Sequence, residues 1–184
     1  MLHFLRLLLQ LTLAPKNGWE DIGNENPDWR PMFYTGFLPL CVISAAAVLF
    51  QLVYHPYYPA IFLIEKSVIQ LVAVFITYYI AEFFFSLYQL RNISGSLNMA
   101  KVRVYMMMVL SVMAVMLMVI NLVPFSPVLM LLPLYIIVVM RMAVTYLGVL
   151  EARIGHFMIL SITTLFAPPL IIMLLFGYLT QQTV

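Results

Sequence analysis

Charged residues are scarce in this chain. Lys, Arg, Asp and Glu together make up 9% of its 184 residues, whereas 65% of the residues are hydrophobic. An average soluble domain is about 25% charged and about 45–50% apolar. A soluble domain of this size could not cover so much apolar surface with so few polar groups. The composition therefore excludes an ordinary water-soluble protein and indicates that lipid surrounds most of the chain.

Cysteine, histidine and the common catalytic motifs are also scarce or missing. The single cysteine, Cys41, lies in an apolar run, so no disulfide can form within the chain, and we interpret it as a small packing residue. The three histidines fall on at least two sides of the predicted membrane, which excludes one shared metal site. No Gly-rich phosphate loop, HExxH, GxSxG or CxxC motif is present. We therefore expect no catalytic residue, cofactor or metal, and the net charge of +2 is too small to indicate a nucleic-acid partner.

Long apolar runs are what the sequence does contain. A bilayer core of about 30 Å requires roughly 20 apolar helical residues. Strands of a membrane barrel would instead alternate over segments of about ten residues. The runs here are continuous and longer, which predicts an all-α bundle of five transmembrane helices. They cover residues 32–54, 67–88, 104–123, 128–150 and 157–179.

The distribution of basic residues predicts the orientation of these helices. With five crossings, seven Lys and Arg residues fall on the N-terminal side and Lys66 falls alone on the other side. Because basic residues accumulate on the cytoplasmic side, we expect the N-terminus in the cytoplasm and the C-terminus outside it. The predicted parts are a cytoplasmic segment (1–31), the five-helix transmembrane domain (32–179) and a short tail (180–184).

The first thirteen residues are predicted to form a separate short helix. His3, Arg6 and Gln10 are spaced so that they share one face of a helix that is otherwise mainly apolar. Such a helix lies in the membrane interface, and Pro15 ends it. A signal peptide is the alternative, but Gln10 interrupts its apolar region and the residues before Pro15 form a poor cleavage site. We therefore favour the interfacial amphipathic helix.

Two ionisable residues lie within the predicted spans. Glu82 is in the second span and Arg141 is in the fourth. Both spans run in the same direction, and at about 1.5 Å per residue the two side chains lie at similar depth in the cytoplasmic half. An ion pair would lower the cost of placing both charges in lipid. The sequence thus predicts a Glu82–Arg141 pair, either structural or part of a relay, with an Arg141 that extends to the headgroups as the alternative.

Residues 13–22 carry a resemblance to a known family. The segment Leu13-Ala14-Pro15-Lys16-Asn17-Gly18-Trp19-Glu20-Asp21-Ile22 resembles the opening of bacterial members of the Yip1 family. In those proteins an apolar helix, a proline and Trp-Glu-x-Ile precede a polar spacer and five spans. The matching residues are Pro15, Trp19, Glu20 and Ile22, and Phe37-Leu38-Pro39-Leu40 at the start of the first span is also similar.

The resemblance implies an integral protein of the bacterial inner membrane without catalytic residues. Eukaryotic relatives associate with small GTPases and carry an Asp-Leu-Tyr-Gly-Pro element before their spans. This chain lacks that element, so the resemblance does not extend to GTPase binding. We expect a structural or scaffolding membrane protein whose partners are lipids, other copies of itself or other membrane proteins. The alternative is a small transporter or channel that uses Glu82 and Arg141, and a membrane enzyme is disfavoured.

Overall fold

The structure, a computed structural model, describes residues 2–54, 57, 59–91, 98–123 and 132–181. Within these residues the regular structure is entirely helical, as the composition and the apolar runs predicted. The elements are α1 (Leu2–Leu13), α2 (Pro15–Glu25), α3 (Trp29–Met32), η1 (Phe33–Phe37), α4 (Leu38–Ala46), η2 (Ala47–Phe50), α5 (Gln51–Tyr54), α6 (Ala60–Arg91), α7 (Met99–Leu122), α8 (Tyr135–Leu147), η4 (Glu151–Arg153), α9 (Ile154–Ser161), η5 (Ile162–Phe166) and α10 (Ala167–Gln181).

Long, continuous apolar helical segments, hereafter rods, make up most of the described part of the chain. Four of them are long and apolar enough to cross a membrane, and they overlap the first, second, third and fifth predicted spans. The first rod combines α3, η1, α4, η2 and α5, and the last combines η4, α9, η5 and most of α10. The four rods are compatible with an integral membrane protein. Their bounds are Trp29–Tyr54, Ala60–Tyr88, Met99–Leu122 and Glu151–Phe176.

The predicted fourth span, residues 128–150, differs from the other four. Its described part is the apolar helix Leu132–Leu147, which is shorter than the four rods. At 1.5 Å per residue it extends about 24 Å, less than the bilayer core of about 30 Å. Residues 124–131 lie outside the described residues. The predicted count of five crossings is therefore not confirmed.

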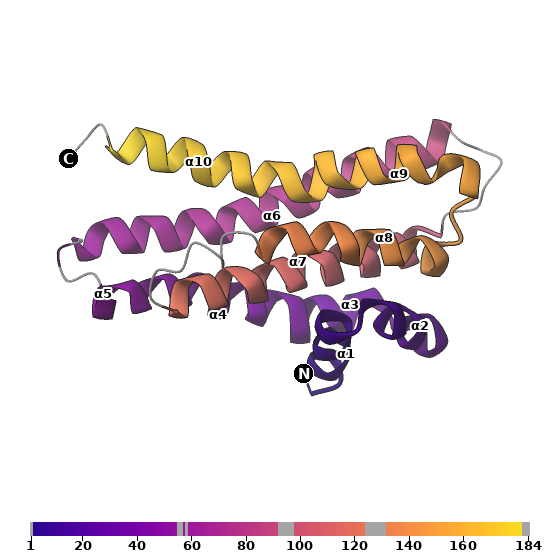
Figure 1. Cartoon of the computed structure of the whole chain (residues 1–184), viewed down its shortest axis with the longest axis horizontal. Helices are drawn as coiled ribbons and strands as arrows, with labels where there is room; N and C mark the ends of the chain where they lie inside the picture. Colours follow the sequence, from indigo (N-terminus) through magenta and orange to yellow (C-terminus); the bar gives the residue numbers. More distant parts are fainter. Residues whose placement is uncertain (1, 55–56, 58, 92–97, 124–131, 182–184) are drawn as a thin grey trace.

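The helices form an elongated bundle in which the first three rods alternate in direction (Figure 1). Helix α8 runs opposite to α7, so the last rod runs in the same direction as α7 (Figure 1). The α3 start, the α6 end, the α7 start and the α9 start lie toward one end of the bundle. The α5 end, the α6 start and the described end of α10 lie at the other (Figure 1). The short helices α1 and α2 sit together on one side of the bundle, and α1 runs across its long axis rather than along it (Figure 1).

Helix α7 forms the centre of the bundle. Most of its residues are buried, and its methionines Met106, Met107 and Met108 are fully enclosed. A helix that is apolar on all sides is stable only when other helices or lipid surround it. Helix α6, by contrast, leaves one face free, with exposed large side chains spaced by three or four residues. Such a face is unfavourable in water and suits contact with acyl chains.

Two prolines explain local changes in the first and last rods. The turn η1, directly before Leu38-Pro39, is a π-helix in which the Leu38 N–H donates to the Phe33 carbonyl. The turn η5, directly before Ala167-Pro168, is also a π-helix. A proline ring clashes with the carbonyl four residues earlier and has no N–H to donate, so the preceding turn widens. Both rods continue past these prolines instead of ending there.

Candidate functional sites in the bundle and the N-terminal hairpin

Glu82 of α6 forms an ion pair with Arg103 of α7. The Arg103 Nε donates to Glu82 Oε1 at 2.8 Å, and Arg103 Nη2 lies 2.7 Å from the same oxygen. Both side chains are partly buried. The Arg103 guanidinium also lies over the Trp29 ring, 4.5 Å from its centroid. The carboxylate is thus neutralised where α6, α7 and the start of the first rod meet.

The structure pairs Glu82 with Arg103 and not with Arg141, the partner that the sequence predicted. Arg141 is exposed on α8 and forms no ion pair within 4.0 Å among the described residues. The prediction matched the two residues by depth, which does not determine the direction in which each side chain points. It also started the third span at residue 104, whereas Asn98 caps α7 and its helix begins at Met99. Arg103 is consequently a helical residue facing α6, not a loop residue.

A second polar cluster joins three helices at the opposite end of the bundle. Gln51 donates to Asn121 Oδ1 at 2.7 Å and accepts from Lys66 Nζ at 3.0 Å. Asn121 in turn donates to Gln70 Oε1 at 3.3 Å. Gln70 donates to Ser44, whose hydroxyl donates to the α7 carbonyl of Ala114. A hydrogen-bonded chain therefore links the first rod, α6 and α7.

The two glutamines of this cluster were not selected from the sequence. Gln51 and Gln70 are uncharged, so a search for ionisable residues in spans does not select them. The sequence feature that could have identified them is an amide side chain within or at the end of an apolar stretch. An unpaired polar group is costly there, so such a side chain is expected to have a hydrogen-bond partner. Gln70 and Asn121 are buried, and each makes a hydrogen bond to a side chain of another helix. The cluster holds the helices in register and places hydrogen-bonding groups inside the bundle.

The family-like motif places its residues in distinct roles. Pro15 is at the start of α2, where its missing N–H costs nothing. Trp19 and Ile22 lie on the inner face of α2 and are buried. The Trp19 indole N–H donates to the Val139 carbonyl of α8 at 2.9 Å, and its ring stacks on Tyr146 at 5.2 Å. The motif therefore anchors α2 on α8.

Helix α1 is held by close packing. The Phe4 ring lies on Gly36 of the first rod, where an added Cβ would come within 2.3 Å of the Phe4 Cγ. The α1 backbone also approaches α2 closely, because a Cβ on Gly18 would come within 2.5 Å of the Leu11 Cα. The two glycines allow contacts that no larger residue would permit. Helices α1 and α2 thus form a compact unit, hereafter the N-terminal hairpin (residues 2–25).

The polar stripe that the sequence predicted on α1 faces the acidic side of α2. His3 Nε2 lies 3.0 Å from Glu25 Oε2, and Arg6 Nη2 lies 4.0 Å from Glu25 Oε1. Gln10 donates to the Asp21 carboxylate. The stripe is thus a set of contacts within the hairpin. Asp21 and Glu25 are four residues apart, which places them on one face of α2.

The remaining face of α1 is a stripe of exposed leucines. Phe4, Leu7, Leu8 and Leu11 are buried against the rest of the protein. The opposite face is formed by leucines spaced by three or four residues, hereafter the leucine stripe. The stripe is apolar and has no contact that covers it in the described part of the chain. Its members are Leu2 (86% exposed), Leu5 (37%), Leu9 (61%) and Leu13 (76%).

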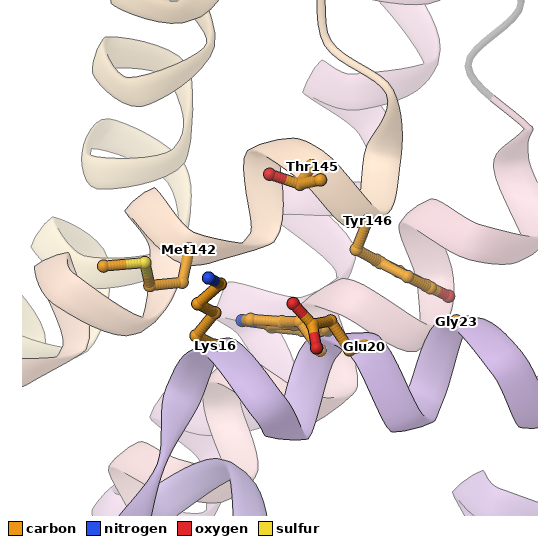
Figure 2. Close-up of a pocket in the computed structure, with 7 residues that line it drawn as sticks. Lys16, Glu20, Gly23, Met142, Thr145 and Tyr146 are labelled. Carbon is orange, nitrogen blue, oxygen red and sulfur yellow. The ribbon is translucent and has the colours of Figure 1, made fainter.

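A cavity of about 310 Å³ lies between α2 and α8 (Figure 2). Lys16 and Glu20 rise from α2 toward α8, and Met142 and Thr145 face them from α8 (Figure 2). Trp19, Gly23 and Tyr146 complete the lining. Glu20, the one exposed residue of the Trp-Glu-x-Ile motif, therefore contributes a carboxylate to this cavity instead of packing in the core.

Comparison of the chain with protein-family models, with curated proteins and with solved structures finds no match. The likeness to the Yip1 family therefore remains a prediction from the sequence.

Proposed function

We propose that this chain is a Yip1-type integral membrane protein that organises the bilayer and its partners and has no enzymatic activity. The proposed protein crosses a bacterial inner membrane five times, with the N-terminus in the cytoplasm and the C-terminus outside it. One observation carries the proposal: the N-terminal hairpin is docked on the bundle in a way that leaves the leucine stripe of α1 uncovered.

The direction of α1 supports an action on one leaflet. If the long rods cross the membrane, a helix that runs across their axis lies in the plane of the membrane (Figure 1). The leucine stripe would then enter the boundary between headgroups and acyl chains. A wedge in one leaflet couples to curvature, and docking of Trp19 on α8 would fix the wedge relative to the spans. Lipids and neighbouring membrane proteins are the proposed partners.

Vesicle shape tests this function. Wild-type protein reconstituted into large vesicles should produce tubules or smaller vesicles as the protein-to-lipid ratio rises. Leu5→Ser combined with Leu9→Ser should abolish this change, because it removes apolar area from the wedge while the buried face of α1 stays intact. Leu5→Met with Leu9→Met is the matched control and should retain the activity. Equal remodelling by all three proteins, or none by the wild type, would refute the proposal.

The proposed topology has its own test. A reporter that is active only outside the cytoplasm should be active when fused after Val184 and inactive when fused before Leu2. The basic residues, seven against one, support this orientation. A cytoplasmic C-terminus would mean an even number of crossings and would remove α8 from the set of spans.

A small transporter or channel is the second candidate, and the polar cluster at the far end of the bundle favours it. Hydrogen-bonded groups connect Lys66 through Gln51, Asn121 and Gln70 to Ser44. Vesicles containing a pH-sensitive dye would report proton flux, and parallel samples would report potassium flux. Transport predicts a flux that Gln70→Leu removes without loss of folded protein. No flux above that of protein-free vesicles would leave the cluster with a structural role.

A further inference from the structure

The cavity between α2 and α8 carries two opposite charges on one wall. Lys16 and Glu20 are four residues apart on α2, so they project from the same face one turn apart. Both are exposed, and neither forms an ion pair within 4.0 Å among the described residues. Figure 2 shows both side chains directed toward α8. One ammonium and one carboxylate are thus presented to the same space.

We propose that this cavity binds the phosphoethanolamine headgroup of an aminophospholipid. A zwitterionic headgroup carries a phosphate and a primary ammonium on adjacent short segments. The Lys16 ammonium would bind the phosphate, and the Glu20 carboxylate would accept hydrogen bonds from the lipid ammonium. The Thr145 hydroxyl on the opposite wall adds a neutral donor and acceptor. A volume of about 310 Å³ lies at the lower end of the range for ligand pockets, roughly 300–1,000 Å³, which suits a headgroup.

The surroundings of the cavity favour a lipid over a soluble zwitterion. A second, mainly apolar hollow of about 600 Å³ runs along α1. It is lined by the leucine stripe and Ala14, together with Arg6 and Gln10. Ala14 and Lys16, two residues apart at the corner of the hairpin, line the two hollows. A lipid with its headgroup at Lys16 and Glu20 would find apolar surface for an acyl chain beside Leu9 and Leu13. This inference rests on the proposed function in one respect, the placement of α1 at the bilayer surface.

The aromatic floor gives the cavity a fixed shape. Trp19 is buried and stacks on Tyr146, and the Lys101 ammonium lies 5.6 Å from the centroid of the Tyr146 ring. The Trp19 hydrogen bond to Val139 holds α2 against α8, so the distance between the two walls is set by buried contacts. A preformed site of this kind loses little conformational entropy when the ligand binds.

Native mass spectrometry of the full chain tests the inference directly. The detergent-solubilised protein is equilibrated with equal amounts of phosphatidylethanolamine, phosphatidylcholine and phosphatidylglycerol, and the retained lipids are compared. We expect phosphatidylethanolamine to bind at least about tenfold more tightly, because choline has no N–H for Glu20 and glycerol has no positive charge. Lys16→Gln and Glu20→Gln should each lower this affinity by about tenfold. Both residues are exposed, so neither change disturbs the core.

Two further variants keep the test specific. Lys16→Arg retains the positive charge and should retain most of the binding. Glu151→Gln removes an exposed carboxylate from η4, outside the cavity lining, and should change nothing. Equal retention of all three lipids, unaffected by Lys16→Gln, would overturn the inference, as would a preference for phosphatidylglycerol that ignores Glu20→Gln. The leucine variants that stop vesicle remodelling keep Lys16 and Glu20, so they should keep the preference for phosphatidylethanolamine over the other two lipids. Failure of the proposed function and failure of this site therefore give different results.

Discussion

Replacing Trp19 with alanine should undock the N-terminal hairpin from the bundle while the long rods stay folded. The Trp19 side chain is 2% exposed, donates to the Val139 carbonyl at 2.9 Å and stacks on Tyr146. Truncating a buried tryptophan to alanine costs about 3–5 kcal/mol, a sum of lost burial and the cavity left behind. Because the Trp19 side chain joins α2 to α8, we expect that cost to fall on docking of the hairpin.

Hydrogen–deuterium exchange of the reconstituted protein measures this effect. A docking free energy lowered by about 3–5 kcal/mol should raise amide exchange in α1 and α2 by about a hundredfold to several thousandfold, provided that opening of the hairpin limits exchange. Exchange in the middle of α7 should not change. Trp19→Phe keeps a ring but loses the indole donor, and it should produce an intermediate effect of about 1–2 kcal/mol.

Tyr34→Ala is the control for loss of an aromatic side chain, since Tyr34 is 68% exposed. It should leave exchange in the hairpin unchanged. Two outcomes would contradict the expected undocking. Unchanged exchange in α1 and α2 of Trp19→Ala would show that the tryptophan does not hold the hairpin. Equal acceleration in α7 would show that the hairpin and the bundle unfold as one unit.

Three further predictions concern packing and polar contacts, and thermal unfolding in detergent measures each. Gly18→Ala should destabilise the protein by about 1–3 kcal/mol, because the new Cβ meets the Leu11 Cα at 2.5 Å. In Gly23→Ala on the same helix, the new Cβ contacts only Tyr146 Cδ2, at 3.5 Å, so the change should be neutral or stabilising by up to about 1 kcal/mol. Equal effects of the two changes would contradict the close approach of α1 and α2. Glu82→Gln or Arg103→Gln alone should lower the stability by about 1–3 kcal/mol, and exchanging the two residues should recover part of that stability. Single variants as stable as the wild type would show that the ion pair contributes nothing. Asn121→Ala should cost about 1–2 kcal/mol because it removes a hydrogen-bond partner from two glutamines, and an unchanged melting temperature would argue against the polar cluster.

Length and composition were sufficient to predict the helices, because lipid solvation requires long, continuous apolar segments. The start of the third span was less well predicted. Arg103 was assigned to a loop because charges mark the ends of hydropathy windows, whereas α7 begins at Met99 and carries Arg103 in its second turn. Hydropathy thus locates the apolar centre of a helix better than its ends.

The lateral arrangement of the helices could not be predicted from the sequence. In a soluble protein the polar face of a helix marks the side that points away from its neighbours. In a membrane bundle, lipid and neighbouring helices are both apolar surroundings. The residue type at most positions therefore does not show whether the position faces lipid or another helix. Glu82 was therefore paired with Arg141 by depth, while the structure places it against Arg103. The same limit concealed the contacts of Gln51 and Gln70.

The N-terminal motif shows what a sequence resemblance can and cannot supply. Residues Pro15, Trp19, Glu20 and Ile22 were selected together, without any indication of what each one touches. The structure separates them, with Trp19 and Ile22 in the core and Glu20 at the cavity. The close approaches at Gly18 and Gly36 were not predicted, because a glycine within a helix gives no sign of its neighbour.

The depth of single spin labels in the membrane tests the proposed placement of α1. In that placement α1 lies in the membrane interface with its leucine stripe in lipid. Cys41, the single cysteine, is first replaced by alanine, and labels are then placed singly at Leu9 and at Asn24, which is exposed on α2. Power saturation in vesicles compares access to oxygen, which concentrates in lipid, with access to a water-soluble nickel chelate. We predict that the label at Leu9 is reached by oxygen and protected from the chelate, while the label at Asn24 shows the reverse. Equal access of the chelate to both labels would place α1 in water, against the proposed action on the bilayer.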